Sequence, residues 1–162
     1  MRWLRLVFQL IQGLETLPLR FRKHQNNATK VASFLQDHDA VSRVIYPSLF
    51  EDAEKTLEDK YLAKGQGALI GIEITGGADA GRVLIDALRL IYHVANMGDA
   101  ISLAVHPAST THSQISPADQ LAAGVTPGYV RLSVGIEHSD DIIADISLAL
   151  DTASATSQKT VA

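Results

Sequence analysis

Hydrophobic residues recur along the chain with two spacings, which separate predicted helices from predicted strands. Residues 3–38 follow the helical spacing, and Pro18 predicts a kink or break within this stretch. Further helices are predicted over residues 51–62 and 78–88, from Ser116, and from Ser139. Strict alternation, typical of a strand with one buried face, marks residues 68–74 and 129–134. Shorter strands are predicted at residues 41–46, 91–94 and 102–106.

These elements predict an α+β fold, not a doubly wound sheet, because the strands are few and each helix has one apolar side. We expect a small, mostly antiparallel sheet with helices mainly on one face, in the manner of an α/β sandwich. Residues 1–38 form the predicted kinked linking helix region, residues 39–153 one domain, and residues 154–162 a frayed polar tail. A chain of 162 residues is long enough to bury a sizeable core.

Composition limits the classes of function. Hydrophobic residues make up 46% of the chain and charged residues 20%, as in ordinary globular proteins. A net charge of −4 gives no reason to expect nucleic acid as a partner. The absence of cysteine excludes disulfides and thiolate chemistry and is compatible with the cytoplasm, where we expect the protein.

The basic and apolar N-terminus superficially resembles a signal peptide. Arg5 and Gln9 interrupt its apolar run, and no small-residue cleavage site follows. The run is also too short to span a bilayer, so we expect no membrane partner. Peripheral anchoring of a membrane protein through this segment stays open as a minor alternative.

The most informative candidate chemistry is a hydroxyl-rich loop, residues 106–112, followed along the chain by Arg131. Alternation places Arg131 on the side of its strand opposite Val130, Leu132 and Val134. A planar guanidinium there could bind a carboxylate through two hydrogen bonds. The alternative, a surface arginine in an ion pair, is about equally compatible with the periodicity.

Other candidates favour structural explanations. Gly65-Gln66-Gly67 precedes a strand and lacks the spacing of a phosphate-binding loop, so a plain turn is predicted. The spacing of His106 and His112 matches no metal motif. Three acidic residues of the last helix are predicted to form a solvated face that complements the helix dipole: Asp140, Asp141 and Asp145.

Several segments together carry a family resemblance that extends over residues 10–150. They are Gly13-Leu14-Glu15-Thr16-Leu17-Pro18-Leu19-Arg20, Asn96-Met97-Gly98-Asp99-Ala100, Ser102-Leu103, residues 106–112, Gly124-Val125-Thr126-Pro127-Gly128, and residues 130–137. These segments resemble the C-terminal domain of the pyridoxal-phosphate-dependent enzymes of cysteine and methionine metabolism, and the branch that they resemble most is O-acetylhomoserine sulfhydrylase.

The resemblance implies the C-terminal domain of an aspartate-aminotransferase-type enzyme that binds a small amino-acid substrate and forms homo-oligomers. Such transferases of methionine biosynthesis exchange the acetate of O-acetylhomoserine for sulfide or a thiol, giving homocysteine or methionine. Arg131 then matches the residue that holds the substrate α-carboxylate. Asn96 matches a loop position whose backbone assists, and Thr111 matches a hydroxyl close to that arginine. Pyridoxal 5'-phosphate would supply the difficult chemistry, and this domain would orient the substrate.

One departure from the family is large. The lysine that binds the cofactor belongs to a large N-terminal domain, which we expect to be absent here, so no catalytic or cofactor-binding residue is assigned. No lysine has the expected Ser/Thr-rich context: Lys23, Lys30, Lys55, Lys60, Lys64 and Lys159. We therefore expect a truncated chain that is inactive alone and does not bind the cofactor covalently. Open alternatives are a noncatalytic binding module and other branches, cystathionine γ-synthase or methionine γ-lyase. The natural thiol acceptor is not determined.

Overall fold

A five-stranded sheet lies at the centre of the computed structural model, which describes residues 2–161, with side chains placed for residues 3–156. In spatial order the strands are β1 (Val41–Ile45), β2 (Leu69–Ile74), β5 (Tyr129–Ser133), β4 (Leu103–Val105) and β3 (Tyr92–His93). Neighbouring strands are antiparallel except β3 and β4, which run parallel. The predicted α+β fold with a mostly antiparallel sheet is confirmed.

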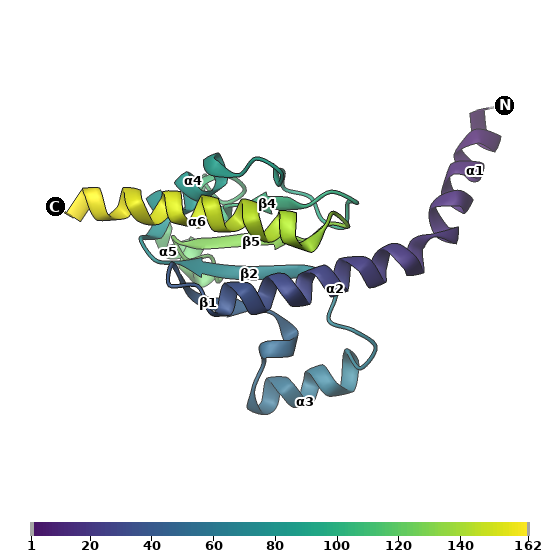
Figure 1. Ribbon diagram of the computed structural model, residues 1–162, viewed down its shortest axis with the longest axis horizontal. Helices are drawn as coiled ribbons and strands as arrows, with labels where there is room; N and C mark the ends of the chain where they lie inside the picture. Colours follow the sequence, from purple (N-terminus) through teal and green to yellow (C-terminus); the bar gives the residue numbers. More distant parts are fainter. Residues whose placement is uncertain (1, 162) are drawn as a thin grey trace.

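Three long helices cover one face of this sheet, as Figure 1 shows: α2 (Leu17–Gln36), α4 (Gly77–Ala87) and α6 (Ser139–Val161). Alternation along the central strands supplies the sheet side of the core. Ile70, Ile72 and Val130 have no exposed surface, and Leu132 is 2% exposed. Because a strand buries every second side chain, the residues between them lie on the face that these helices leave uncovered.

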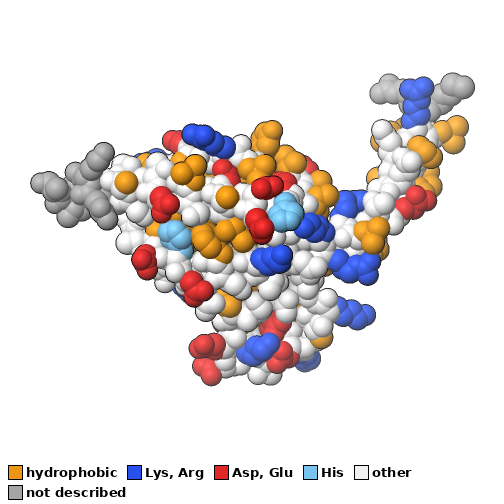
Figure 2. All heavy atoms as spheres, in the orientation of Figure 1, with side chains coloured by type: hydrophobic (Ala, Val, Ile, Leu, Met, Phe, Trp, Pro, Cys, Tyr) orange, Lys and Arg blue, Asp and Glu red, His pale blue; other side chains and the backbone are white. Residues whose placement is uncertain are grey.

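The linking region consists of two helices. α1 (Arg2–Glu15) ends before Thr16, and Pro18 lies in the first turn of α2, where a missing backbone N–H costs nothing. This confirms the predicted break. α1 extends away from the sheet, and Figure 2 shows hydrophobic side chains along it. Trp3 and Leu10 of this helix are 80% and 64% exposed. No helix within residues 2–161 has the length and apolar character needed to cross a membrane.

Two shorter helices complete the set of α-helices within residues 2–161. α3 (Asp52–Tyr61) follows β1 and contains the buried Glu58, which accepts a hydrogen bond of 2.7 Å from Gln66. α5 (Pro117–Ala122) begins after Ser116, whose hydroxyl accepts a hydrogen bond of 3.2 Å from the amide of Asp119. This confirms the predicted N-cap.

Asp145 corrects one prediction. It is 9% exposed, and its carboxylate accepts backbone hydrogen bonds from Arg89, Leu90 and Ile91 at 2.9, 3.0 and 3.1 Å. The predicted solvated position was wrong because the spacing within one helix cannot reveal unpaired amides of another segment. Here those amides belong to the turn that follows α4, and each requires an acceptor once buried.

The end of α6 also differs from the prediction. The helix continues to Val161, so the segment from Ser154 is helical rather than frayed. Hydroxyl groups bond back to carbonyls of the preceding turn, from Thr152 to Leu148 at 2.8 Å and from Ser154 to Leu150 at 3.0 Å. These bonds let polar residues remain within the helix.

Candidate functional site

The candidate site lies on the uncovered face of β5, which carries Tyr129, Arg131 and Ser133. Arg131 is half-buried, and its Nη2 donates a hydrogen bond of 3.2 Å to the carbonyl oxygen of Asn96. Its Nε is buried and has no hydrogen-bond partner among the described residues. Buried nitrogens without a partner are uncommon in folded proteins, so this one indicates a place for an acceptor.

The loop between β3 and β4, residues 94–101, lies over this face. The hydroxyl of Ser133 accepts a hydrogen bond of 3.0 Å from the amide of Gly98, whose φ of 75° suits glycine. The amide of Asn96 donates to Val94 at 2.9 Å, and its side-chain oxygen accepts from Met97 at 2.9 Å. The structure therefore brings Asn96 to Arg131 through the carbonyl group of Asn96.

The hydroxyl-rich loop is organised around a buried histidine. His106 is fully buried, with Nε2 2.7 Å from the carbonyl oxygen of Pro127 and Nδ1 2.8 Å from the hydroxyl of Ser109. Because both ring nitrogens have protein partners, this histidine holds the loop in shape. Thr111 is exposed, and its hydroxyl lies 2.9 Å from Nδ1 of His112. Its place beside Arg131 stays a prediction, since no described contact joins the two.

A second side chain of β5, that of Tyr129, lies on the same face as Arg131. The ring of Tyr129 lies over Gly71, where an added Cβ would be 2.8 Å from the ring carbon Cε2. Burial of the hydroxyl raises the pKa of Tyr129, while the positive charge of Arg131 acts in the opposite direction. The neighbouring Glu73 accepts a hydrogen bond from Thr126.

A cavity of about 400 Å³ adjoins the site between α2 and the loop, and its walls include Phe21, His24, Met97 and Ser133. His24 and the nearby Asn27, both on α2, were not predicted as important residues. His24 is 7% and Asn27 1% exposed. Both side chains form hydrogen bonds to backbone carbonyls of the segment after β5. A signal existed in the sequence: both positions continue the spacing of the apolar side of α2.

Comparison with known proteins places these features in one family. The profile of the Cys/Met metabolism PLP-dependent enzymes matches residues 5–151. An O-acetyl-L-homoserine sulfhydrylase of Leptospira meyeri is 51% identical over 144 residues, which cover 88% of this chain and 33% of that protein. A homocysteine synthase of Schizosaccharomyces pombe is 46% identical over 91% of this chain and 34% of its own length.

Further relatives include an L-methionine gamma-lyase of Treponema denticola, which is 42% identical over 86% of this chain and 35% of its own length. A crystal structure from Campylobacter jejuni, assigned as an O-acetylhomoserine (thiol)-lyase with N'-pyridoxyl-lysine-5'-monophosphate, matches with a TM-score of 0.81. It is 44% identical, over 88% of this chain and 34% of the other. The chain thus spans about one third of the length of these relatives.

Proposed function

Because this chain belongs to the Cys/Met metabolism PLP-dependent enzyme family, we propose that it forms the substrate-side part of an O-acetylhomoserine sulfhydrylase. The resemblance predicted from the sequence is thereby confirmed at the level of the family. The proposed reaction replaces the acetate of O-acetylhomoserine with sulfide or a thiol, giving homocysteine or methionine. A cytoplasmic setting is part of the same proposal.

The observation that carries this proposal is the incomplete hydrogen bonding of Arg131. One terminal nitrogen is held by the carbonyl of Asn96, while Nε has no partner among the described residues. A substrate α-carboxylate would supply both the missing acceptor and the opposite charge. Because the guanidinium is planar, it would hold the carboxylate in one orientation and so direct the rest of the amino acid. In the proposal, Thr111 contributes a hydroxyl beside it.

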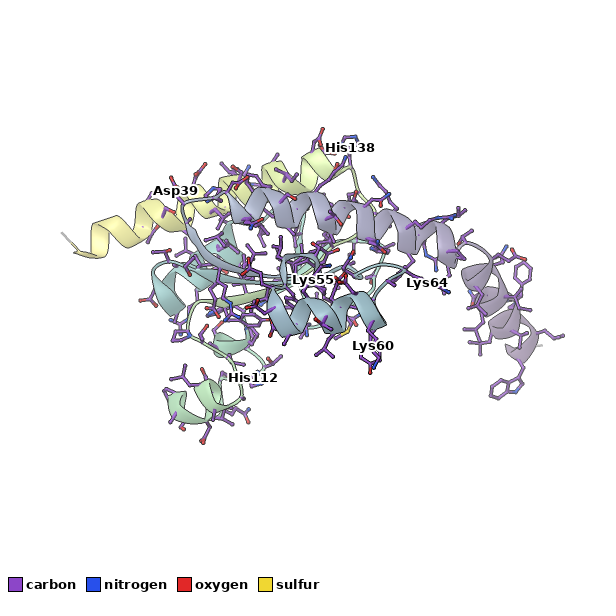
Figure 3. All side chains as sticks on the ribbon, turned by 90° about the horizontal axis from the view of Figure 1, so that it is seen from below. Asp39, Lys55, Lys60, Lys64, His112 and His138 are labelled. Carbon is purple, nitrogen blue, oxygen red and sulfur yellow. The ribbon has the colours of Figure 1, made fainter. Side chains whose placement is uncertain are left out.

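Pyridoxal phosphate, when bound, supplies an electron sink for chemistry at the substrate carbons. Three of the described lysines already have partners within the chain and do not fit the covalent anchor of such a group. Lys55 pairs with Glu58 and Asp59, Lys30 donates to Ser139 at 3.2 Å, and Lys60 lies 5.0 Å from the ring centre of Tyr61. Figure 3 shows Lys55, Lys60 and Lys64 on or just beyond α3. The side chain of Lys159 lies outside the described residues.

We therefore place the cofactor on polypeptide equivalent to the two thirds of the relatives that this chain does not cover. This chain would then contribute substrate orientation and, by itself, no catalysis. The exposed apolar side of α1, including Trp3 and Leu10, is available for contact with that polypeptide or with a second copy in a homo-oligomer.

Binding of O-acetyl-L-homoserine to this chain, followed by NMR chemical shifts of the residue 94–101 amides, tests the proposal. Replacing Arg131 with alanine removes a charged hydrogen-bonding partner worth about 1.5–3 kcal/mol, so affinity should fall roughly ten- to a hundredfold. The exposed Arg82, paired with Asp79 at 2.9 Å, provides the control Arg82→Ala, which should bind normally. Equal affinity of the Arg131→Ala variant and the unaltered chain would refute the carboxylate role. Stoichiometric binding of pyridoxal phosphate to this chain would contradict the placement of the cofactor.

A methionine γ-lyase is the second candidate, because L-methionine gamma-lyases are also among the relatives, at 42% and 40% identity. Both activities require the same carboxylate contact, so Arg131 serves either. Release of methanethiol from methionine by the complete enzyme, without use of O-acetylhomoserine, would favour this candidate.

A further inference from the structure

We propose that Glu137 is a positioning residue for substrate binding, which holds the loop of residues 94–101 in place beside Arg131. The inference rests on the proposed function, in which this loop and Arg131 together receive the substrate carboxylate. Glu137 touches neither partner of that contact. It acts through Ser102, the residue at which the loop joins β4.

The carboxylate of Glu137 accepts two hydrogen bonds from Ser102. One oxygen accepts the backbone amide of Ser102 at 2.6 Å, and the other accepts its hydroxyl at 2.9 Å. The same hydroxyl accepts the amide of Gly135 at 2.8 Å, so Ser102 bridges the loop and the chain beyond β5. Ser102 is 1% exposed, and a hydrogen bond to a charged carboxylate is stronger than a neutral one.

The cluster leaves no room for a larger residue at position 135. A Cβ added to Gly135 would lie 2.5 Å from the amide nitrogen of Ser102 and 2.6 Å from the carbonyl oxygen of Ala100, and it would also meet the Glu137 carboxylate. Ala100 accepts a further backbone bond of 2.8 Å from Ile136. The end of the loop is therefore held against the segment after β5 by several short contacts, which are at least partly buried at Ser102 and Gly135.

The other side of this segment is attached to α2. Asn27 donates to the carbonyls of Gly135 and Glu137 at 3.0 and 2.8 Å, and His24 lies 2.6 Å from the carbonyl of Val134. The backbone that carries Glu137 is thus anchored to a core helix. Its side chain extends from that anchored frame to the loop.

Besides its contact with Arg131, the loop has three attachments to β5 and the segment after it among the described residues. Gly98 is held by Ser133 near its middle, Ala100 by Ile136, and Ser102 by Glu137 at its end. Residues 94–101 themselves are exposed, so little packing restrains them. Loss of the Glu137 attachment should therefore let the loop move, and the carbonyl of Asn96 would lose its set position beside Arg131.

Amide hydrogen exchange of this chain, read residue by residue by NMR, tests the inference without any cofactor. In Glu137→Ala the informative amide is that of Gly98, which Glu137 does not contact. We expect it to exchange at least about tenfold faster, while the Leu132 amide in β5 is unchanged. Glu137→Gln keeps an oxygen that can accept the Ser102 amide, so it should restore the protection of Gly98. The exposed Glu54→Ala is the matched control and should exchange like the unaltered chain.

Unchanged exchange at Gly98 in Glu137→Ala, or no restoration by Glu137→Gln, would overturn the inference. If Glu137→Ala speeds exchange at Leu132 as much as at Gly98, the alanine variant is destabilised as a whole, and Glu137→Asp is measured instead. Aspartate keeps the negative charge on a side chain that is one methylene shorter. The inference then requires faster exchange at the Gly98 amide and unchanged exchange at Leu132; any other pattern refutes it.

A titration with O-acetyl-L-homoserine then separates this inference from the proposed function. If the loop loosens in Glu137→Ala, substrate affinity should fall with it by about tenfold, and Glu137→Gln should recover it. If the unaltered chain shows no binding at all, the carboxylate site itself is wrong, whatever the exchange data show. If binding is present and insensitive to a loosened loop, only the role of Glu137 fails.

Discussion

The two faces of the short strand β5 differ in the side chains that they carry: one face is apolar and the other polar. Val130, Leu132 and Val134 point into the helix-covered core and are at most 2% exposed. Arg131 and Ser133 point the other way, where each bonds to the loop of residues 94–101. The first face gains stability from burial, whereas the second keeps a guanidinium, that of Arg131, whose hydrogen bonding is incomplete. A strand anchored by one face can thus hold a binding group rigidly on the other.

Truncation on the inner face should produce the largest effect. Leu132→Ala removes a fully packed side chain, and such changes typically cost about 2–5 kcal/mol of unfolding free energy. Denaturant unfolding followed by circular dichroism measures the loss. Leu69→Ala is the matched control, since Leu69 lies opposite Ser133 on the neighbouring strand and is 41% exposed. Equal losses at the two leucines would contradict the contrast between the faces.

Asp145 tests whether polar groups on the helix-covered side also serve stability. Asp145→Ala leaves the amides of Arg89, Leu90 and Ile91 without their acceptor, and unsatisfied buried groups cost about 1–3 kcal/mol. Asp145→Asn keeps one acceptor oxygen and should lose less. The exposed Asp141, in the first turn of the same helix, provides the control Asp141→Ala. Its loss should stay below about 1 kcal/mol, the usual value of a dipole interaction. A larger loss at Asp141 than at Asp145 would refute the anchoring role.

Strand alternation and helical spacing were enough to predict the elements, the break before α2 and the outward direction of Arg131. Each of these depends on residues close together in the sequence, where local geometry determines which side a residue faces. Asp145, His24, Asn27 and Glu137 could not be assigned in the same way. Their partners lie between 35 and 110 residues away, because Glu137 meets Ser102 and His24 meets Val134 only after the sheet forms.

Contacts between distant parts of the sequence also limited what could be predicted for Asn96 in the site. The family resemblance placed it beside Arg131, and the structure brings the two together. Which atom makes the contact depends on how the loop turns, and the amide of Gly98 in the loop is held by Ser133 from another part of the chain. No described hydrogen bond joins the hydroxyl of Thr111 to Arg131, so its role stays a prediction.

Removing the guanidinium should separate stability from binding on the outer face. Arg131→Met keeps an unbranched apolar stem but removes the buried Nε that has no partner among the described residues. Relief of that group, worth about 1–3 kcal/mol, should nearly cancel the loss of the charged hydrogen bond to Asn96, worth about 1.5–3 kcal/mol. Unfolding free energy should therefore stay within about 1 kcal/mol of the unaltered chain while O-acetyl-L-homoserine binding weakens. A clear loss of stability would show that Arg131 is structural.

The smallest expected effect concerns alkaline pH and compares two tyrosines. Burial raises the pKa values of Tyr129 and Tyr46 above the usual 10.0, so both stay neutral in the folded chain after they ionise in the unfolded one. Each contributes stability that is fully present below pH 10 and is lost as pH rises above it. Tyr129→Phe should therefore make the alkaline loss of unfolding free energy shallower.

Near neutral pH the two tyrosine variants should differ. The hydroxyl of Tyr46 donates to the carbonyl of Gly67 at 3.1 Å, so Tyr46→Phe should lose about 0.5–1.5 kcal/mol there. No such bond is described for the hydroxyl of Tyr129 within residues 3–156, and Tyr129→Phe should unfold like the unaltered chain. Urea unfolding of both variants at pH 7 and above pH 10 makes the comparison. An alkaline slope unchanged by Tyr129→Phe would mean that this hydroxyl, on the face of Arg131, is better solvated than its burial indicates.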